Sequence, residues 1–144
     1  MSINNITKKD SVRIIEPVNL YGCVLEENVF VGPFVEIQNN VIVNKNTRIQ
    51  SHSFICSNVT IGKNCFIGHG VMFTNDKFLN GKVNFSEFLD TNIGNNVLIG
   101  SNSTILPVKI CDNVVIGAGS VVTKSIDEPG IYVGNPTVKI KNLN

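Results

Sequence analysis

The sequence is poor in the residues that helical and highly charged proteins use. It contains no tryptophan, one alanine (Ala118) and seven leucines among 144 residues, against 19 valines and 18 isoleucines. β-Branched side chains lose rotamer freedom in helices and pack well on the pleated surface of a strand. The 12 basic and 11 acidic residues nearly cancel, which leaves no basic excess for nucleic acid. The composition predicts many short strands and no nucleic-acid partner.

Segments that would direct the chain into a membrane are also missing. No run approaches the roughly 18 apolar residues of a spanning helix, and the N-terminal stretch MSINNITKKDSVRII has no apolar core of a secretory signal. The cysteines Cys23, Cys56, Cys65 and Cys111 show no C-x-x-C spacing, which argues against a zinc ribbon or a redox motif. We therefore expect a cytoplasmic protein without a membrane partner, whose reduced cysteines lie in or near the core.

An aliphatic or aromatic anchor recurs every six positions along most of the chain. The anchors are Leu25, Val31, Ile37, Val43, Ile49, Ile55, Ile61, Ile67 and Phe73, then Ile93, Ile99 and Ile105, and, after one deletion, Ile110, Ile116 and Val122. A single strand would give period two and a helix 3.6. Period six is typical of a hexapeptide solenoid, in which three hexads form one triangular coil of about 18 residues. A β-sandwich would not keep this register over eight steps.

Two kinds of residue recur at the turns between the predicted strands. Asparagine is the commonest residue, with 21 copies, and it tolerates left-handed turns and caps them. Glycine often directly follows an anchor, as at Gly32, Gly62 and Gly68, and we expect it to supply backbone freedom at the bend. The turns are thus predicted to be built mainly by these two residue types.

The middle residue of each predicted strand points away from the core, and several of these are large and apolar. A monomer seldom leaves such a set in water. We expect prism faces to pack against other subunits; coverage by other segments of the same chain is the alternative. The set comprises Phe30, Ile42, Phe54, Phe66, Met72, Leu98, Val115 and Val121.

The six-residue register fails between Phe73 and Ile93, a separation of 20. A solenoid extrudes such an insertion, about residues 74–92, as a loop, often on its binding face. His52 and His69 follow anchors that are 18 residues apart, so we expect them on one corner, roughly 5 Å apart along the axis. We expect both histidines, with Asn75 and Asp76, at the mouth of the loop. For Asn75 and Asp76, an Asx turn that starts the loop is the alternative.

Three runs resemble a known family. They are IQSHSFICSNVTIGKNCFIGHGVMFTND (49–76), IGSNSTILPVKICDNVVIGAGSVVTKSI (99–126) and GNPTVKIK (134–141). From about residue 25 onward the chain resembles hexapeptide-repeat acetyltransferases of bacterial amino-sugar biosynthesis, above all N-acetyltransferases of nucleotide-linked 3-amino sugars such as dTDP-3-amino-3,6-dideoxyhexoses. IGAGSVVTK and GNP are common to many hexapeptide acyltransferases, whereas SHSFIC and GHGVMFTND are more specific.

The resemblance implies an all-β fold, a left-handed parallel β-helix with one extruded loop and little helix. One domain would span residues 1–144, with a C-terminal cap at about 123–144. It also implies a homotrimer with active sites between neighbouring subunits, acetyl-CoA lying along the coils, and a nucleotide sugar approaching from the N-terminal side. Whether the nucleotide is dTDP or UDP stays open.

The resemblance and the chemistry together suggest roles for individual residues. Histidine titrates in the range of a general base, so His69 is the first candidate and His52 the second. Asn75 would orient the sugar, and Asp76 would accept a proton or anchor the amine. The cofactor contacts would be backbone amides along the pantetheine arm, lysines at the phosphates and a proline against adenine or the arm: Gly100, Ser101, Gly117, Ala118, Lys124, Lys139, Lys141 and Pro136.

Two alternatives to an N-acetyltransferase remain. A sugar O-acetyltransferase of the same fold is a close rival, because a hydroxyl acceptor has a greater need of a histidine base. A non-enzymatic β-helix subunit is the other, although it would not require the loop, the paired histidines or the GAG and GNP elements. We expect no metal, since a carbonic anhydrase of this fold needs three histidines around zinc and the chain has two.

Overall fold

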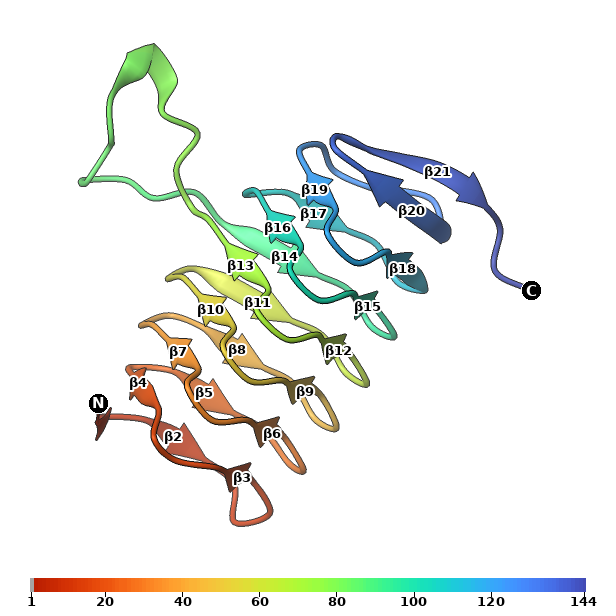
Figure 1. Cartoon of the computed structure of the whole chain (residues 1–144). Coiled ribbons are helices and arrows are strands. Elements are labelled where there is room, and N and C mark those ends of the chain that lie inside the picture. The colour runs from red at the N-terminus through yellow and green to blue at the C-terminus, as the bar shows by residue number, and fades with distance from the viewer. Residues whose placement is uncertain (1) are drawn as a thin grey trace.

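A computed structural model describes residues 2–144 as a triangular prism of parallel strands (Figure 1). Face 1 contains β1 (Ile3–Asn4), β4 (Asn19–Tyr21), β7 (Glu36–Ile37), β10 (Phe54–Ile55), β13 (Met72–Phe73), β16 (Thr104–Ile105) and β19 (Val121–Val122). Face 2 contains β2 (Thr7–Lys8), β5 (Val24–Leu25), β8 (Ile42–Val43), β11 (Val59–Ile61), β14 (Thr91–Ile93) and β17 (Lys109–Ile110). Face 3 contains β3 (Arg13–Ile14), β6 (Phe30–Val31), β9 (Arg48–Ile49), β12 (Phe66–Ile67), β15 (Leu98–Ile99), β18 (Val114–Ile116), β20 (Gly130–Gly134) and β21 (Thr137–Lys141). This architecture confirms the expected left-handed parallel β-helix.

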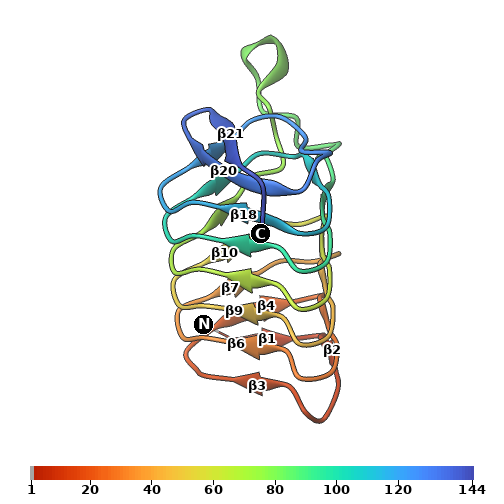
Figure 2. The ribbon, with the colours of Figure 1, turned by 90° about the vertical axis from the view of Figure 1, so that its right-hand side faces the viewer.

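The register between coils follows the sequence period. Each strand pairs in parallel with the strand one coil later, and Figure 2 shows the coils stacked like rungs. Val31 pairs with Ile49, 18 residues on, whereas Leu98 pairs with Val115, 17 residues on, after the single deletion. Across the insertion, Ile61 pairs with Ile93. The extra residues therefore leave the coil as a loop while the anchors stay aligned.

The anchors fill the interior of the prism together with the residues that lie two positions before them. Ile37, Ile49 and Ile67, for example, are fully buried. Two polar members of the second row are paired within the core: the hydroxyl of Thr47 donates to the carbonyl of Gly62 at 2.8 Å, and that of Ser53 donates to the carbonyl of Gly68 at 2.7 Å. The buried hydroxyl of Thr91 is an exception and has no partner within residues 2–144. Short strands of Val and Ile thus bury one continuous core, and the hydroxyl groups of Thr47 and Ser53 keep their hydrogen-bond partners inside it.

The turns use asparagine as expected, but glycine differently. Ten asparagines take a positive φ, typically three positions after an anchor, as Asn28 and Asn46 do. The glycines directly after anchors, such as Gly62, have no positive φ; instead, a Cβ on Gly62 would clash with the backbone carbonyl of Gly94 in the next coil. The prediction that these glycines supply backbone freedom was wrong. They are required because stacked coils leave no room for a side chain.

The three edges of the prism differ in the residues that carry the positive φ. We call the edge from face 2 to face 3 the asparagine edge, because Asn28, Asn46, Asn64, Asn96 and Asn113 line it. We call the edge from face 3 to face 1 the histidine edge; its corresponding residues are Phe34, His52, Gly70, Asn102 and Gly119. We call the edge from face 1 to face 2 the loop edge, because residues 74–90 leave the prism there.

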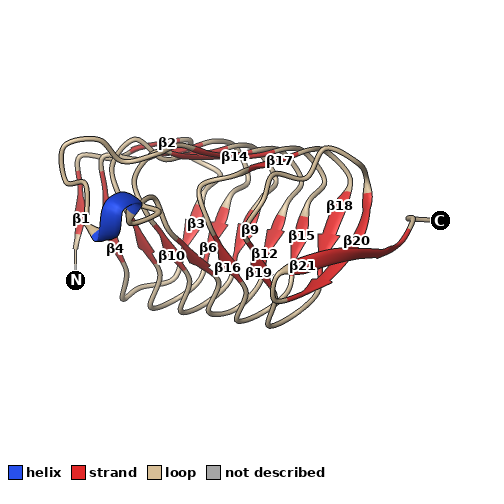
Figure 3. Ribbon diagram, turned by 90° about the horizontal axis from the view of Figure 1, so that it is seen from above, coloured by secondary structure: helices blue, strands red, loops and turns tan. Residues whose placement is uncertain are grey.

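Two features break the regularity of the coils. The loop of residues 74–90 stands out from the prism, carries the short 3-10 helix η1 (Leu79–Gly81) and leans toward the N-terminal coils (Figure 3). At the other end β20 and β21 pair antiparallel, so the last segment forms a hairpin rather than another coil. No helix between residues 2 and 144 is long and apolar enough to cross a membrane.

Candidate active site

The histidine edge brings together half of the twelve candidate site residues named from the sequence. His52 takes the positive-φ position of its coil, with φ 65°, and His69 directly precedes the equivalent Gly70. Ser101 and Ala118 occupy the position of His69 in the two following coils. The expectation that both histidines share one corner is confirmed, with an offset of one residue. His69 therefore has the candidate cofactor residues on its C-terminal side.

Hydrogen bonds hold His69 in the corner while its side chain stays exposed. The hydroxyl of Ser51, one coil earlier, lies 2.9 Å from Nδ1 of His69. The backbone N–H of His69 donates to the hydroxyl of Ser101, one coil later, at 3.2 Å. When Nδ1–H donates to Ser51, Nε2 carries the free lone pair that a base needs.

His52 is oriented in a different way, by stacking on Phe34. The two ring centroids are 5.0 Å apart, with an interplanar angle of 33°. Phe34 also has a positive φ, 62°. A left-handed residue other than glycine costs about 1–2 kcal/mol, and an aromatic pair returns about 0.5–1.5 kcal/mol. One stack thus does not offset two such residues, and fold stability alone does not account for this pair.

The candidate cofactor residues fall into two groups. Gly100, Ser101, Gly117 and Ala118 lie on the histidine edge, but the amides of Gly100 and Gly117 donate to the carbonyls of Ile116 and Tyr132 at 2.8 and 2.9 Å. The N–H groups of Gly100 and Gly117 therefore hold neighbouring coils together. What these two glycines can offer a ligand is the space left by a missing side chain. The amides of Ser101 and Ala118 have no hydrogen-bond acceptor within residues 2–144, and they lie close to Gly68 and Gly100 of the preceding coils.

The second group lies at the C-terminal hairpin. Lys124, Pro136 and Lys139 line a cavity of about 340 Å³ beside β21, which Lys141 does not line. The ammonium of Lys139 lies 3.6 Å from the carboxylate of Glu128, and the Lys139 side chain is only 26% exposed. A lysine held partly buried next to an open cavity suits a phosphate-bearing ligand, with Lys124 as a second cation.

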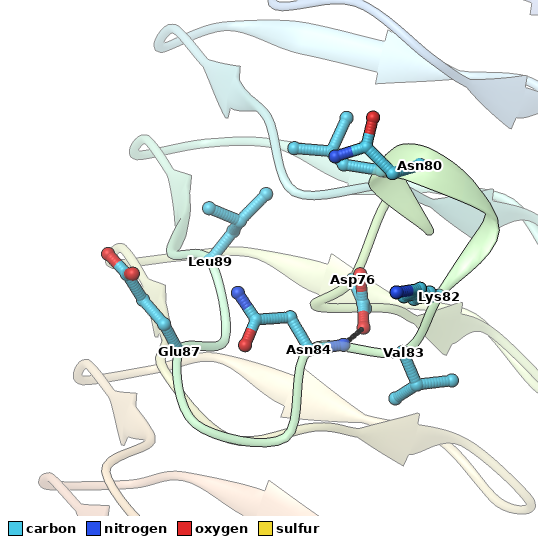
Figure 4. Close-up of a pocket in the computed structure, with 8 residues that line it drawn as sticks. Asp76, Asn80, Lys82, Val83, Asn84, Glu87 and Leu89 are labelled. Atoms are coloured by element: carbon cyan, nitrogen blue, oxygen red, sulfur yellow. Dashed lines mark hydrogen bonds between the residues drawn. The ribbon is translucent and has the colours of Figure 1, made fainter.

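Asn75 and Asp76 lie at the root of the loop. The amide of Asn75 donates to the carbonyl and hydroxyl oxygens of Ser57 at 3.2 and 2.9 Å. The carboxylate of Asp76 accepts the N–H of Phe78 at 2.9 Å and that of Asn84 at 2.6 Å (Figure 4). The bond to Phe78 closes an Asx turn and the bond to Asn84 spans the loop, so Asp76 holds the loop in shape.

Two cavities adjoin the loop. One, of about 520 Å³, lies within the loop, where Asp76, Lys82 and Glu87 are among the lining side chains (Figure 4). The other, of about 490 Å³, runs between the loop and face 1. Its lining includes Asn75, Asp76 and the aromatic residues Tyr21, Phe54, Phe73, Phe78 and Phe88.

The histidines and the loop residues do not form one cluster within a chain. His69 lies in the turn before β13, on the histidine edge, whereas Asn75 follows the end of β13 on the loop edge. The expectation that they meet at the mouth of the loop was wrong for a single subunit. Six residues carry the chain across a whole face, so equivalent corner positions are separated by the width of that face.

The outward apolar residues are concentrated on the two faces that flank the histidine edge. Face 3 carries Phe30, Phe66, Leu98 and Val115, and face 1 carries Phe54, Met72 and Val121. Face 2 carries only Ile42 of this set. On face 3 the guanidinium of Arg48 lies 4.0 Å from the ring centroid of Phe30. A set of outward-facing apolar side chains on two adjoining faces is typical of a protein interface.

The cysteines are not suited to nucleophilic chemistry. Cys23, Cys56 and Cys65 are buried and Cys111 is half-buried, which confirms their expected place in or near the core. Burial raises the pKa of Cys23 to about 11 and that of Cys56 to about 12. Cys56 lines the cavity between the loop and face 1, but because of its raised pKa it stays a neutral thiol at physiological pH. An acyl-cysteine intermediate does not fit this site.

Phe34 was missed by the sequence reading. Its signal becomes visible when the chain is written in rows of one coil, because Phe34 stands where the other coils of the histidine edge have histidine, glycine or asparagine. No cluster of three or more His, Cys, Asp or Glu side chains that could hold a metal occurs within residues 2–144.

Comparisons with known families agree with this architecture. One family model, described as hexapeptide repeat of succinyl-transferase, matches residues 58–72 and 91–124. A second, described as bacterial transferase hexapeptide (six repeats), matches residues 22–57. Together they cover more than half of the chain. The chain belongs to the hexapeptide-repeat family.

Two curated relatives match a shorter stretch. A probable macrolide acetyltransferase of Lysinibacillus sphaericus is 51% identical over 53 residues, which are 36% of this chain and 29% of the relative. The galactoside O-acetyltransferase of Escherichia coli K12 is 53% identical over 53 residues, 36% of this chain and 26% of the relative. The match thus spans less than a third of these relatives.

Solved structures match over almost the whole chain. AntD, an N-acyltransferase from Bacillus cereus, in a mutant form in complex with dTDP and coenzyme A, gives a TM-score of 0.73 at 22% identity over 98% of this chain and 82% of its own. PerB from Caulobacter crescentus, in complex with CoA and GDP-perosamine, gives 0.68 at 19% identity over 96% of this chain and 57% of its own. At these identities the likeness concerns the fold.

Proposed function

We propose that this protein is an acyltransferase that moves the acetyl group of acetyl-CoA to the amine of a nucleotide-linked amino sugar, with a dTDP-3-amino-3,6-dideoxyhexose as the first candidate. The observation that carries the proposal is the histidine edge, where the exposed His69 borders a corner with two unpaired amides, those of Ser101 and Ala118. The likeness to AntD and PerB supports the substrate class. Because acetyl-CoA is an intracellular metabolite, we place the reaction in the cytoplasm and expect it to serve glycan assembly.

The chemistry asks for one base and one electrophile held close together. The amine nitrogen attacks the thioester carbonyl, a C–N bond forms, the C–S bond breaks and CoA leaves through sulfur. The proton lost by the amine passes to Nε2 of His69 and on to the leaving sulfur. Ser51 fixes the ring through Nδ1 and acts as a positioning residue. The amides of Ser101 and Ala118 supply hydrogen bonds to the arm of acetyl-CoA.

The proposed assembly is a homotrimer with the active site between subunits. Within one chain His69 and Asn75 lie at opposite ends of β13, so a site that uses both must take one from a neighbour. The apolar faces 1 and 3 on either side of the histidine edge supply a surface for that contact. Analytical ultracentrifugation tests this assembly, and a stable monomer would contradict a site between subunits.

The second candidate is sugar O-acetylation. Its support is the relative named galactoside O-acetyltransferase, together with a histidine whose Nδ1 is held by a serine. A hydroxyl is a poorer nucleophile than an amine and depends more strongly on a base. The acceptor chemistry therefore separates the two candidates.

A thiol-release assay with acetyl-CoA and matched pairs of nucleotide amino- and hydroxy-sugars tests the proposal. We expect release with an amino sugar, and a loss of about 100-fold or more in kcat for His69→Asn with KM for acetyl-CoA little changed. Asn64→Gly, on the asparagine edge, keeps the left-handed turn and serves as the matched control with unchanged kcat. Release only with hydroxy-sugars would favour the second candidate, and no release with any acceptor would overturn both.

A further inference from the structure

The Phe34–His52 pair is a surface feature that the proposed reaction does not use. Phe34 is 48% exposed although it is a phenylalanine in a left-handed turn. The next coil of the same edge has His52 at this position, and the coils after it have Gly70, Asn102 and Gly119. Asparagine or glycine would form this turn with less backbone strain. The exposed ring of Phe34 therefore suggests a role other than packing.

The position of the pair along the edge suggests what it binds. Coils are spaced by about 4.8 Å, so Phe34 lies roughly two coils, or about 10 Å, on the N-terminal side of His69's coil. Ser101 and Ala118 lie on the C-terminal side, where acetyl-CoA is proposed to lie. In a nucleotide sugar, a ribose and a diphosphate separate the base from the sugar by a distance of that order.

We infer that Phe34, stacked on His52, is the platform for the heteroaromatic base of the nucleotide-linked substrate. The inference rests on the proposed function and adds a base subsite to it. An exposed aromatic ring binds a base by stacking, without base-specific hydrogen bonds. His52 then acts as a positioning residue, because its ring supports Phe34 at a centroid distance of 5.0 Å. One edge would thus hold both substrates end to end, with His69 between them.

Adenine of CoA is the other source of a heteroaromatic base. The cavity beside the C-terminal hairpin, with Lys124 and Lys139, already suits the phosphate-bearing end of CoA. That cavity lies at the opposite end of the prism from Phe34, as the positions of β6 and β21 in Figure 1 show. The nucleotide of the acceptor is therefore the occupant that the geometry favours.

The test measures calorimetric binding of dTDP, UDP, CoA and inorganic pyrophosphate to wild type, Phe34→Asn and Phe34→Trp. Asparagine suits the left-handed turn, so Phe34→Asn removes the ring without loss of thermal stability. We expect it to weaken nucleoside diphosphate binding about 5- to 100-fold. Binding of CoA and pyrophosphate should stay unchanged, and Phe34→Trp should retain nucleotide affinity.

Three results would overturn the inference: no nucleoside diphosphate binding by wild type, unchanged nucleotide affinity in Phe34→Asn, or a loss confined to CoA. The thiol-release assay keeps this test apart from the proposed function. Acetyl transfer in which Phe34→Asn has an unchanged KM for the nucleotide sugar overturns the platform alone. Ring-dependent nucleotide binding without any acetyl transfer supports the platform and overturns the proposed function.

Discussion

The asparagine edge and the histidine edge are made by the same repeat, yet the residues with a positive φ differ in four of the five coils that carry one on both edges. Along the asparagine edge the left-handed position is always asparagine, and Asn28 and Asn46 are linked by a side-chain hydrogen bond of 3.1 Å. Along the histidine edge that position holds phenylalanine, histidine, glycine or asparagine. The asparagine edge has the residue that its backbone favours, whereas the histidine edge departs from it where Phe34 and His52 stack. In this solenoid, the turns of one edge serve the structure, and the turns of another edge carry the candidate site.

The largest expected effect comes from breaking coil stacking at the asparagine edge. In Gly62→Ala the new methyl group would clash with the carbonyl of Gly94, so we expect a loss of about 3 kcal/mol or more and a fall in Tm of about 10 °C. Circular dichroism melting measures it.

Gly119→Ala is the matched control for that substitution. Its φ of 68° strains an alanine, but nothing lies within 4 Å of the added methyl group. We expect a loss of about 1 kcal/mol. Equal losses in the two variants would contradict the view that post-anchor glycines are there for space.

A smaller effect should follow from placing an aromatic residue on the structural edge. Asn46→Phe puts phenylalanine at φ 63° and removes the acceptor of the Asn28 amide. We expect a loss of about 1–2 kcal/mol, seen as a Tm lower by several degrees, and no change in ligand affinity. Asn46→Gly controls for the lost hydrogen bond. If Asn46→Phe melted like wild type, the cost assigned to Phe34 at the histidine edge would be wrong.

The repeat made the prism predictable from the sequence. Each anchor recurs at a fixed interval, so the burial of Ile49 or Ile67 and the pairing of coils follow from counting. The role of Gly62 could not be obtained that way, because it depends on how closely the next coil approaches. The C-terminal hairpin was also beyond counting, since β20 and β21 leave the hexad pattern and pair antiparallel.

The candidate site was predictable only in part. Spacing placed His52 and His69 on one corner, because their anchors are one coil apart. Spacing also suggested that Asn75 lies near them, yet a six-residue step crosses a whole face, and the two groups lie on different edges. The role of Asp76 within the loop depends on the fold of that loop, which has no repeat to count.

Hydrogen–deuterium exchange with and without CoA tests most directly whether the two edges differ in function. The account predicts that CoA slows exchange in peptides of the histidine edge that contain Ser101 and Ala118. Peptides of the asparagine edge that contain Asn64 and Asn96 should exchange at unchanged rates. Protection confined to the asparagine edge, or equal on both edges, would contradict the account.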